Sequence, residues 1–86
     1  MLRIRLTRMG RHKSPFYRIV AIDSKTRRDG KYIELLGTYA PLDGTVELKN
    51  DEIIRHLKNG AQPSETVLNI LKKQGIWKSF VESKNN

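Results

Sequence analysis

The start of the chain alternates strictly between apolar and polar side chains. Residues 2–7 place an apolar side chain at every even position and a polar one at every odd position. This is the period-2 pattern of a strand with one buried face. Residues 16–23 are more continuously apolar, and Pro15 before them fits only the start of a strand or an edge, because it donates no ladder hydrogen bond. We therefore predict two strands, of which the second is the more central.

Two further strands are predicted in the middle of the chain. Asp29-Gly30 is a tight-turn signal, and residues 31–39 then read as a third strand that returns beside the second. Gly37 within it indicates a bulge or a close approach of another backbone. Residues 45–48 form a short fourth strand in which every second side chain is apolar.

The second half changes to a helical period. Asn50 is a candidate N-cap for a helix that stops at Gly60, with acidic residues in its first turn. Ser64 caps a second helix that ends near Gly75, with lysines in its last turn. The tail after Ile76 carries Trp77, Phe80 and Val81, which can pack on the sheet or the helices, and its last residues are expected to fray.

Strands followed by helices predict an α+β fold. We expect a small mixed β-sheet of four to five strands with two short helices packed on one face, which leaves the other sheet face free. The expected domain is single and covers residues 1–86, with a core over about residues 2–76 and a partly disordered tail over residues 77–86. The longest aliphatic run is far too short to span a membrane, and the opening residues lack the apolar core of a signal peptide. We therefore expect a soluble, intracellular protein.

Charge is concentrated at one end of the chain. Residues 1–31 hold ten lysines and arginines against two acidic residues, whereas residues 32–86 hold seven against seven, so the net charge of +8 comes from the first third. Segregated positive charge is typical of a surface for a polyanion. A chain of 86 residues without cysteine has a small core and no disulfide or thiolate zinc site. A partner that binds only the folded form would stabilise it.

The basic residues of the first third favour nucleic acid as that partner. Seven of the ten are arginine, whose planar fork binds phosphate bidentately. Phe16 and Tyr17 alternate across the second strand, so one ring should face the core while the other can lie on the basic side and stack on an unpaired base. The ten basic residues are Arg3, Arg5, Arg8, Arg11, Lys13, Arg18, Lys25, Arg27, Arg28 and Lys31.

An enzyme is the first alternative. Asp23, Asp29 and Glu34 could hold magnesium for phosphodiester cleavage, since metal-dependent nucleases need converging carboxylates. Each also has a local explanation: Asp29 in its turn, Asp23 in a turn closed by its own carboxylate, and Glu34 in an ion pair with an arginine. The two histidines, His12 and His56, have no partner at metal-ligand spacing. We interpret His12 as a donor to phosphate and His56 as a helix-surface residue, and we expect no cofactor and no metal.

Two binding alternatives remain open. A general nucleic-acid packaging or chaperone module would bind duplex DNA and unrelated RNA equally well. Membrane binding ranks below it, because the basic excess lies on predicted strands rather than on an amphipathic helix. The chain contains no glycine-rich phosphate loop and no nucleophile elbow.

Several separated motifs resemble one family. The run "IRLTRMGRHKSPFYRIVAIDSKTRRDGKYIELLGTYAP", followed by "NGAQPSETVLNILKKQGI", is similar to the bacterial-type small-subunit ribosomal protein sixteen. The resemblance covers about residues 2–76. It implies a small non-catalytic α+β protein in the body of the small ribosomal subunit. Such a protein contacts the 5′ region of 16S ribosomal RNA (rRNA) and aids assembly of the subunit.

The resemblance and the basic segment together define the expected binding residues. The implied partners are 16S rRNA and neighbouring small-subunit ribosomal proteins, with no membrane, small-molecule substrate or homo-oligomer. The implied location is the cytoplasm, within the ribosome, and the sequence fits an organelle-encoded protein such as a plastid one equally well. The expected rRNA-binding residues are Arg3, Arg5, Arg8, Arg11, His12, Lys13, Tyr17, Arg18, Lys25, Arg27, Arg28 and Lys31.

Overall fold

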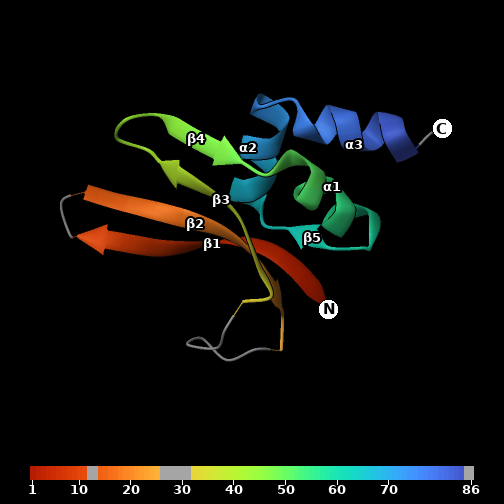
Figure 1. Ribbon diagram of the computed structural model, residues 1–86, viewed down its shortest axis with the longest axis horizontal. Helices are drawn as coiled ribbons and strands as arrows, with labels where there is room; N and C mark the ends of the chain where they lie inside the picture. Colours follow the sequence, from red (N-terminus) through yellow and green to blue (C-terminus); the bar gives the residue numbers. More distant parts are fainter. Residues whose placement is uncertain (12–13, 26–31, 85–86) are drawn as a thin grey trace.

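The computed structural model describes residues 1–11, 14–25 and 32–84, which form two layers (Figure 1). Within these ranges five strands make one mixed sheet in the order β4-β3-β2-β1-β5, and three helices cover one face of it. The α+β class and the mixed sheet predicted from the sequence are confirmed. The strands are β1 (Leu2–Arg11), β2 (Ser14–Asp23), β3 (Glu34–Ala40), β4 (Thr45–Leu48) and β5 (Gln62–Pro63). The helices are α1 (Asn50–Lys58), α2 (Glu65–Lys73) and α3 (Ile76–Lys84).

The β1–β2 pair is a long antiparallel hairpin whose faces follow the sequence alternation. Ile4 lies opposite Ala21 and Leu6 lies opposite Ile19. Ile4, Ile19 and Ala21 are fully buried under the helices. The even positions of β1 and the odd positions of β2 therefore face the helices, and the alternate positions face away from them.

Gly37 lies next to a bulge in β3 and at a close approach to β4, the two features that the sequence indicated. The register between β2 and β3 shifts at Ile19/Val20, where the extra residue, Leu36, turns into the core. A Cβ atom on Gly37 would lie only 2.3 Å from the carbonyl oxygen of Glu47 on β4. Only glycine lets β4 pair this closely with β3 at that point.

The fifth strand, β5, was not resolved in the sequence prediction. It pairs in parallel with β1 through Gln62 opposite Arg3 and Pro63 opposite Ile4. Two residues carry no readable period, so the pattern of side chains gives no signal for it. Pro63 is tolerated because β5 is an edge strand.

The two predicted helices form, and one of the two predicted caps is wrong. Ser64 precedes α2 in extended conformation, and its hydroxyl accepts a hydrogen bond from the Val67 N–H at 3.4 Å, as predicted. Asn50 is the first residue of α1 rather than its cap; Lys49 occupies the cap position and makes no side-chain cap bond. The cap prediction was therefore one residue too late.

The predicted number of helices is too low by one. The tail forms a third helix, α3. Ile76 and Phe80 are buried, and their four-residue spacing puts them on one side of a helix. The rings of Trp77 and Phe80 lie 5.4 Å apart at 51°. This apolar side gives α3 a packing surface against α1 and α2, which an exposed tail would lack.

The main buried cluster lies between the sheet and the helices. The described residues contain no helix long and apolar enough to cross a membrane. The buried cluster consists of Ile4, Ile19, Ala21, Leu36, Ile53, Leu57, Ala61, Val67, Leu71, Ile76 and Phe80.

Candidate nucleic-acid interface

Among the side chains that the structure describes, three arginines lie on the sheet face turned away from the helices. Arg3 and Arg5 occupy odd positions of β1, and Arg18 occupies an even position of β2, opposite Thr7. Strand alternation thus directs all three away from the helices. Arg3 is exposed, and Arg5 and Arg18 are half-buried. We call these three residues the open-face arginines.

Apolar residues lie beside these arginines on the same face. Val20 and Ile22 are only 1% and 4% exposed, although they point away from the helices. In the hairpin register Val20 lies opposite Arg5 and Ile22 lies opposite Arg3. Arginine stems can cover such apolar side chains while the guanidinium stays in water. The open face therefore combines apolar side chains with the charged groups beside them.

The open-face arginines are free to bind an outside anion. Among the described residues, ion pairs form between the N-terminal ammonium and Asp23 and between Glu34 and the α1 residues Arg55 and His56. In that part of the chain no carboxylate pairs with an open-face arginine. An unpaired guanidinium keeps its full donor fork for phosphate.

Arg8 and Tyr17 lie on the opposite, helix-facing side. They face each other in the hairpin register, and the Tyr17 ring stacks on Tyr39 with centroids 6.3 Å apart and planes at 26°. Phe16, opposite Met9, is the ring on the open face and is 36% exposed. The sequence prediction left open whether Phe16 or Tyr17 faces the helices. Ile19 faces them, and Tyr17 lies two residues earlier on the same strand, so Tyr17 is on the same side.

Two of the remaining predicted contacts, Arg11 and Lys25, lie at the ends of β1 and β2. Arg11 ends β1 opposite Ser14. Lys25 is exposed just after β2, and its N–H donates to the Asp23 Oδ1 at 2.9 Å. Five predicted contacts fall outside the described residues: His12, Lys13, Arg27, Arg28 and Lys31.

The candidate magnesium ligands have local roles. Asp23 accepts the Lys25 N–H, and this bond, with the nearby N-terminal ammonium at 3.6 Å, holds the Asp23 pKa below its ordinary value. Glu34 pairs with an arginine as the alternative interpretation predicted, here Arg55 of α1 at 2.6 Å. Within the described ranges no group of three or more acidic, histidine or cysteine residues could hold a metal; Asp29 lies outside them.

His56 is not the surface residue that the sequence predicted. It is 5% exposed, and its Nε2 lies 2.6 Å from the Glu34 Oε1. Its position between Ile53 and Leu57 on the buried side of α1 explains the burial. Sequence periodicity could have found this, since residues 53, 56 and 57 share one helix face.

Comparison with known proteins gives the family. Residues 8–64 match the family described as Ribosomal protein S16. The chain is 56% identical over 85 residues to "Small ribosomal subunit protein bS16" of Ureaplasma parvum, covering 99% of this chain and 84% of that protein. It is 54% identical over 84 residues to the protein of the same name from Mycoplasmoides gallisepticum, covering 98% of each.

A second Ureaplasma relative agrees. The chain is 55% identical to the bS16 of Ureaplasma urealyticum over 85 residues, with 99% of this chain and 84% of that protein covered. Ribosomal proteins of this kind are structural constituents and not enzymes, which removes the nuclease interpretation. Both the matched residues and the relatives' identities therefore place this chain in the ribosomal protein S16 family.

Proposed function

We propose that this chain is a structural constituent of the small ribosomal subunit that binds the 5′ region of 16S rRNA and aids subunit assembly. Its relatives carry the name of a small ribosomal subunit protein. In this role its partners are the rRNA and neighbouring ribosomal proteins, and it works in the cytoplasm within the ribosome.

The observation that carries the proposal is the open face with Arg3, Arg5 and Arg18. These guanidiniums have no carboxylate partner among the described residues, and the face is not covered by helices. They can bind phosphates while the strands fix their spacing. Because the sheet holds the guanidinium groups at fixed positions, they suit recognition of the shape of a folded RNA rather than recognition of its base sequence.

RNA binding also accounts for the small core. A ligand that binds only the folded chain adds stability in proportion to the logarithm of its concentration over the dissociation constant. The bound protein can then be stable although its buried cluster is limited to one face of the sheet. The same linkage holds the bound RNA segment in its folded shape, which is how such a protein aids assembly.

The test is equilibrium binding of the full chain to the 5′ domain of 16S rRNA over a salt series. An unrelated structured RNA and duplex DNA of equal length serve as competitors. We expect the 5′ domain to remain bound at salt that releases both competitors, because shape-specific contacts add to the counterion-release contribution. Release of all three ligands at the same salt, also with neighbouring ribosomal proteins added, would identify a general polyanion binder instead.

A further inference from the structure

A row of side chains crosses the helix-facing side of the sheet beyond the core. Arg8 lies opposite Tyr17, Tyr17 opposite Tyr39, and Tyr39 opposite Val46. Directly opposite residues share a sheet face, so the row leads from an exposed guanidinium across two stacked rings to the edge strand β4. In Figure 1 this part of the sheet extends past the helices toward the end of the β1–β2 hairpin.

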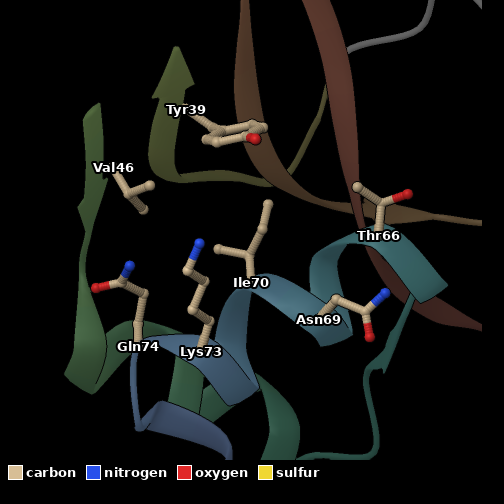
Figure 2. Close-up of a pocket in the computed structure, with 7 residues that line it drawn as sticks. All are labelled: Tyr39, Val46, Thr66, Asn69, Ile70, Lys73 and Gln74. Atoms are coloured by element: carbon tan, nitrogen blue, oxygen red, sulfur yellow. The ribbon is translucent and has the colours of Figure 1, made fainter. Parts of the chain in front are cut away.

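A pocket of about 240 Å³ lies at the end of the row, between β3, β4 and α2 (Figure 2). Its apolar walls come from Tyr39 and Val46 on the sheet and from Ile70 on α2. Figure 2 shows the Tyr39 ring across the pocket from Ile70, with the Lys73 side chain extending from α2 beside it. A pocket below the usual range of about 300–1,000 Å³ for drug-sized ligands suits one small planar group.

The other lining residues are polar and have free hydrogen-bonding groups. Thr66, Asn69, Lys73 and Gln74 supply a hydroxyl, two amides and an ammonium group. Across the described part of the chain, none of these four side chains has a hydrogen-bond or ion-pair partner. No carboxylate of a described residue lines the pocket. Its charge therefore favours an anionic ligand.

We propose that this pocket receives one unpaired nucleotide of the bound RNA. The base packs against Tyr39, its polar edge bonds to the amides of Asn69 and Gln74, and a phosphate binds the Lys73 ammonium. An apolar side chain from a neighbouring protein would fill the same walls but would leave these polar groups without partners, at a cost in free energy. A nucleotide satisfies both the walls and the polar groups.

The inference rests on the proposed function and adds a contact on a second face. Arg3, Arg5 and Arg18 bind RNA on the open face, whereas the pocket lies on the helix-facing side. RNA that reaches both sides must pass around an edge or an end of the sheet. Arg8 and Tyr17, at the hairpin end of the row, lie along such a path.

The test uses the complex of the full chain with the 5′ domain of 16S rRNA. Ultraviolet crosslinking followed by mass spectrometry of the peptides should find a nucleotide adduct on Tyr39 or within α2. Lys73→Gln should reduce the slope of log affinity against log salt by about one, as expected for the loss of one phosphate contact. Lys72→Gln is the matched control, since Lys72 is exposed on the same turn and does not line the pocket.

Two substitutions of Tyr39 separate stacking from general packing. Tyr39→Phe retains the ring and should bind RNA like the wild type. Tyr39→Leu should weaken binding about fivefold to a hundredfold, the range for removing one aromatic stack. Circular dichroism melting checks the fold of each, and if Tyr39→Leu does not fold, the Lys73→Gln and Lys72→Gln pair and the crosslink decide.

Each other outcome overturns the inference in a recognisable way. Adducts confined to the open face, with Lys73→Gln binding like Lys72→Gln, would overturn the pocket and leave the proposed function intact. A crosslink from Lys73 to a neighbouring protein in the assembled subunit would assign the pocket to a protein contact. Loss of specific 5′ domain binding by the wild type would count against the proposed function itself, and the pocket inference would fall with it.

Discussion

The Oε1 atom of Glu34 on β3 lies 2.6 Å from the Nε2 atom of His56 on α1. The same oxygen accepts a hydrogen bond from the Arg55 Nη2, also at 2.6 Å. His56 is buried, and its Nδ1 has no partner within the described ranges. Glu34 therefore supplies the polar contact of a buried imidazole and ties α1 to the first residue of β3.

The Glu34 contact should make stability depend on pH. The hydrogen bond from His56, together with the Arg55 charge, holds the pKa of Glu34 below its ordinary value of 4.5. A carboxylate with a lowered folded-state pKa stabilises the fold above its unfolded pKa and loses this contribution as pH falls through the folded pKa. Glu34→Gln should therefore lower the free energy of unfolding at neutral pH, and its difference from the wild type should shrink in acid.

Urea unfolding from neutral pH down to about pH 3 measures this difference. Glu47→Gln is the control, because Glu47 is exposed on β4 and its side chain has no ion-pair partner among the described residues. It should unfold like the wild type at neutral pH. A difference between Glu34→Gln and the wild type that stays constant over the whole pH range would show that the carboxylate charge is not the source of the stabilisation.

Local patterns were enough to predict most of the sheet and its cationic face. The alternation from Leu2 to Thr7 fixes which side of β1 is buried, and the register of the hairpin then follows from burying one face. Arg3, Arg5 and Arg18 were predicted as RNA contacts from the basic segment and the family resemblance. Their shared position on the open face follows from the same period of two.

The features that the sequence did not predict depend on contacts between residues far apart in the chain. A local pattern of side chains carries no information about such contacts. Pro63 pairs with β1 across more than fifty residues of sequence, and Glu34 meets His56 across 22 residues. The pocket beside Tyr39 exists only where β3, β4 and α2 come together. By contrast, α3 was predictable from the spacing of its apolar residues and was missed because the tail over residues 77–86 was expected to be partly disordered.

Replacing Arg3, Arg5 and Arg18 together by glutamine should weaken binding to the 5′ domain of 16S rRNA. Loss of three phosphate contacts should reduce the salt slope by about three. The free fold should persist, because glutamine keeps part of the stem over Val20 and Ile22. Filter binding over a salt series, with a melt of the free protein, measures both.

The control for the triple variant removes the same charge elsewhere. Lys58, Lys72 and Lys78 are exposed residues of the three helices, and their replacement by glutamine lowers the net charge equally. If this control loses as much salt slope as the arginine variant, binding follows net charge and the open face has no special role.

The two candidate caps should respond differently to alanine. Ser64→Ala removes the hydroxyl that accepts the Val67 N–H, so it should cost about 1 kcal/mol of stability. Asn50→Ala should change stability by less than about 0.5 kcal/mol, since its side chain makes no cap bond. Urea unfolding of the two variants compares them, and equal costs would contradict the assignment of Ser64 as the cap that matters.

The third helix should contribute to the stability of the whole domain. Phe80 is buried in the core cluster and packs its ring against Trp77, so Phe80→Ala should cost about 3–5 kcal/mol. Val81, the next residue, is 40% exposed, and Val81→Ala should change stability by no more than about 0.5 kcal/mol. Fluorescence of the single tryptophan, Trp77, follows unfolding in urea. If both substitutions lower the free energy of unfolding by the same small amount, α3 does not contribute to stability. The sheet, α1 and α2 would then account for the stability of the domain.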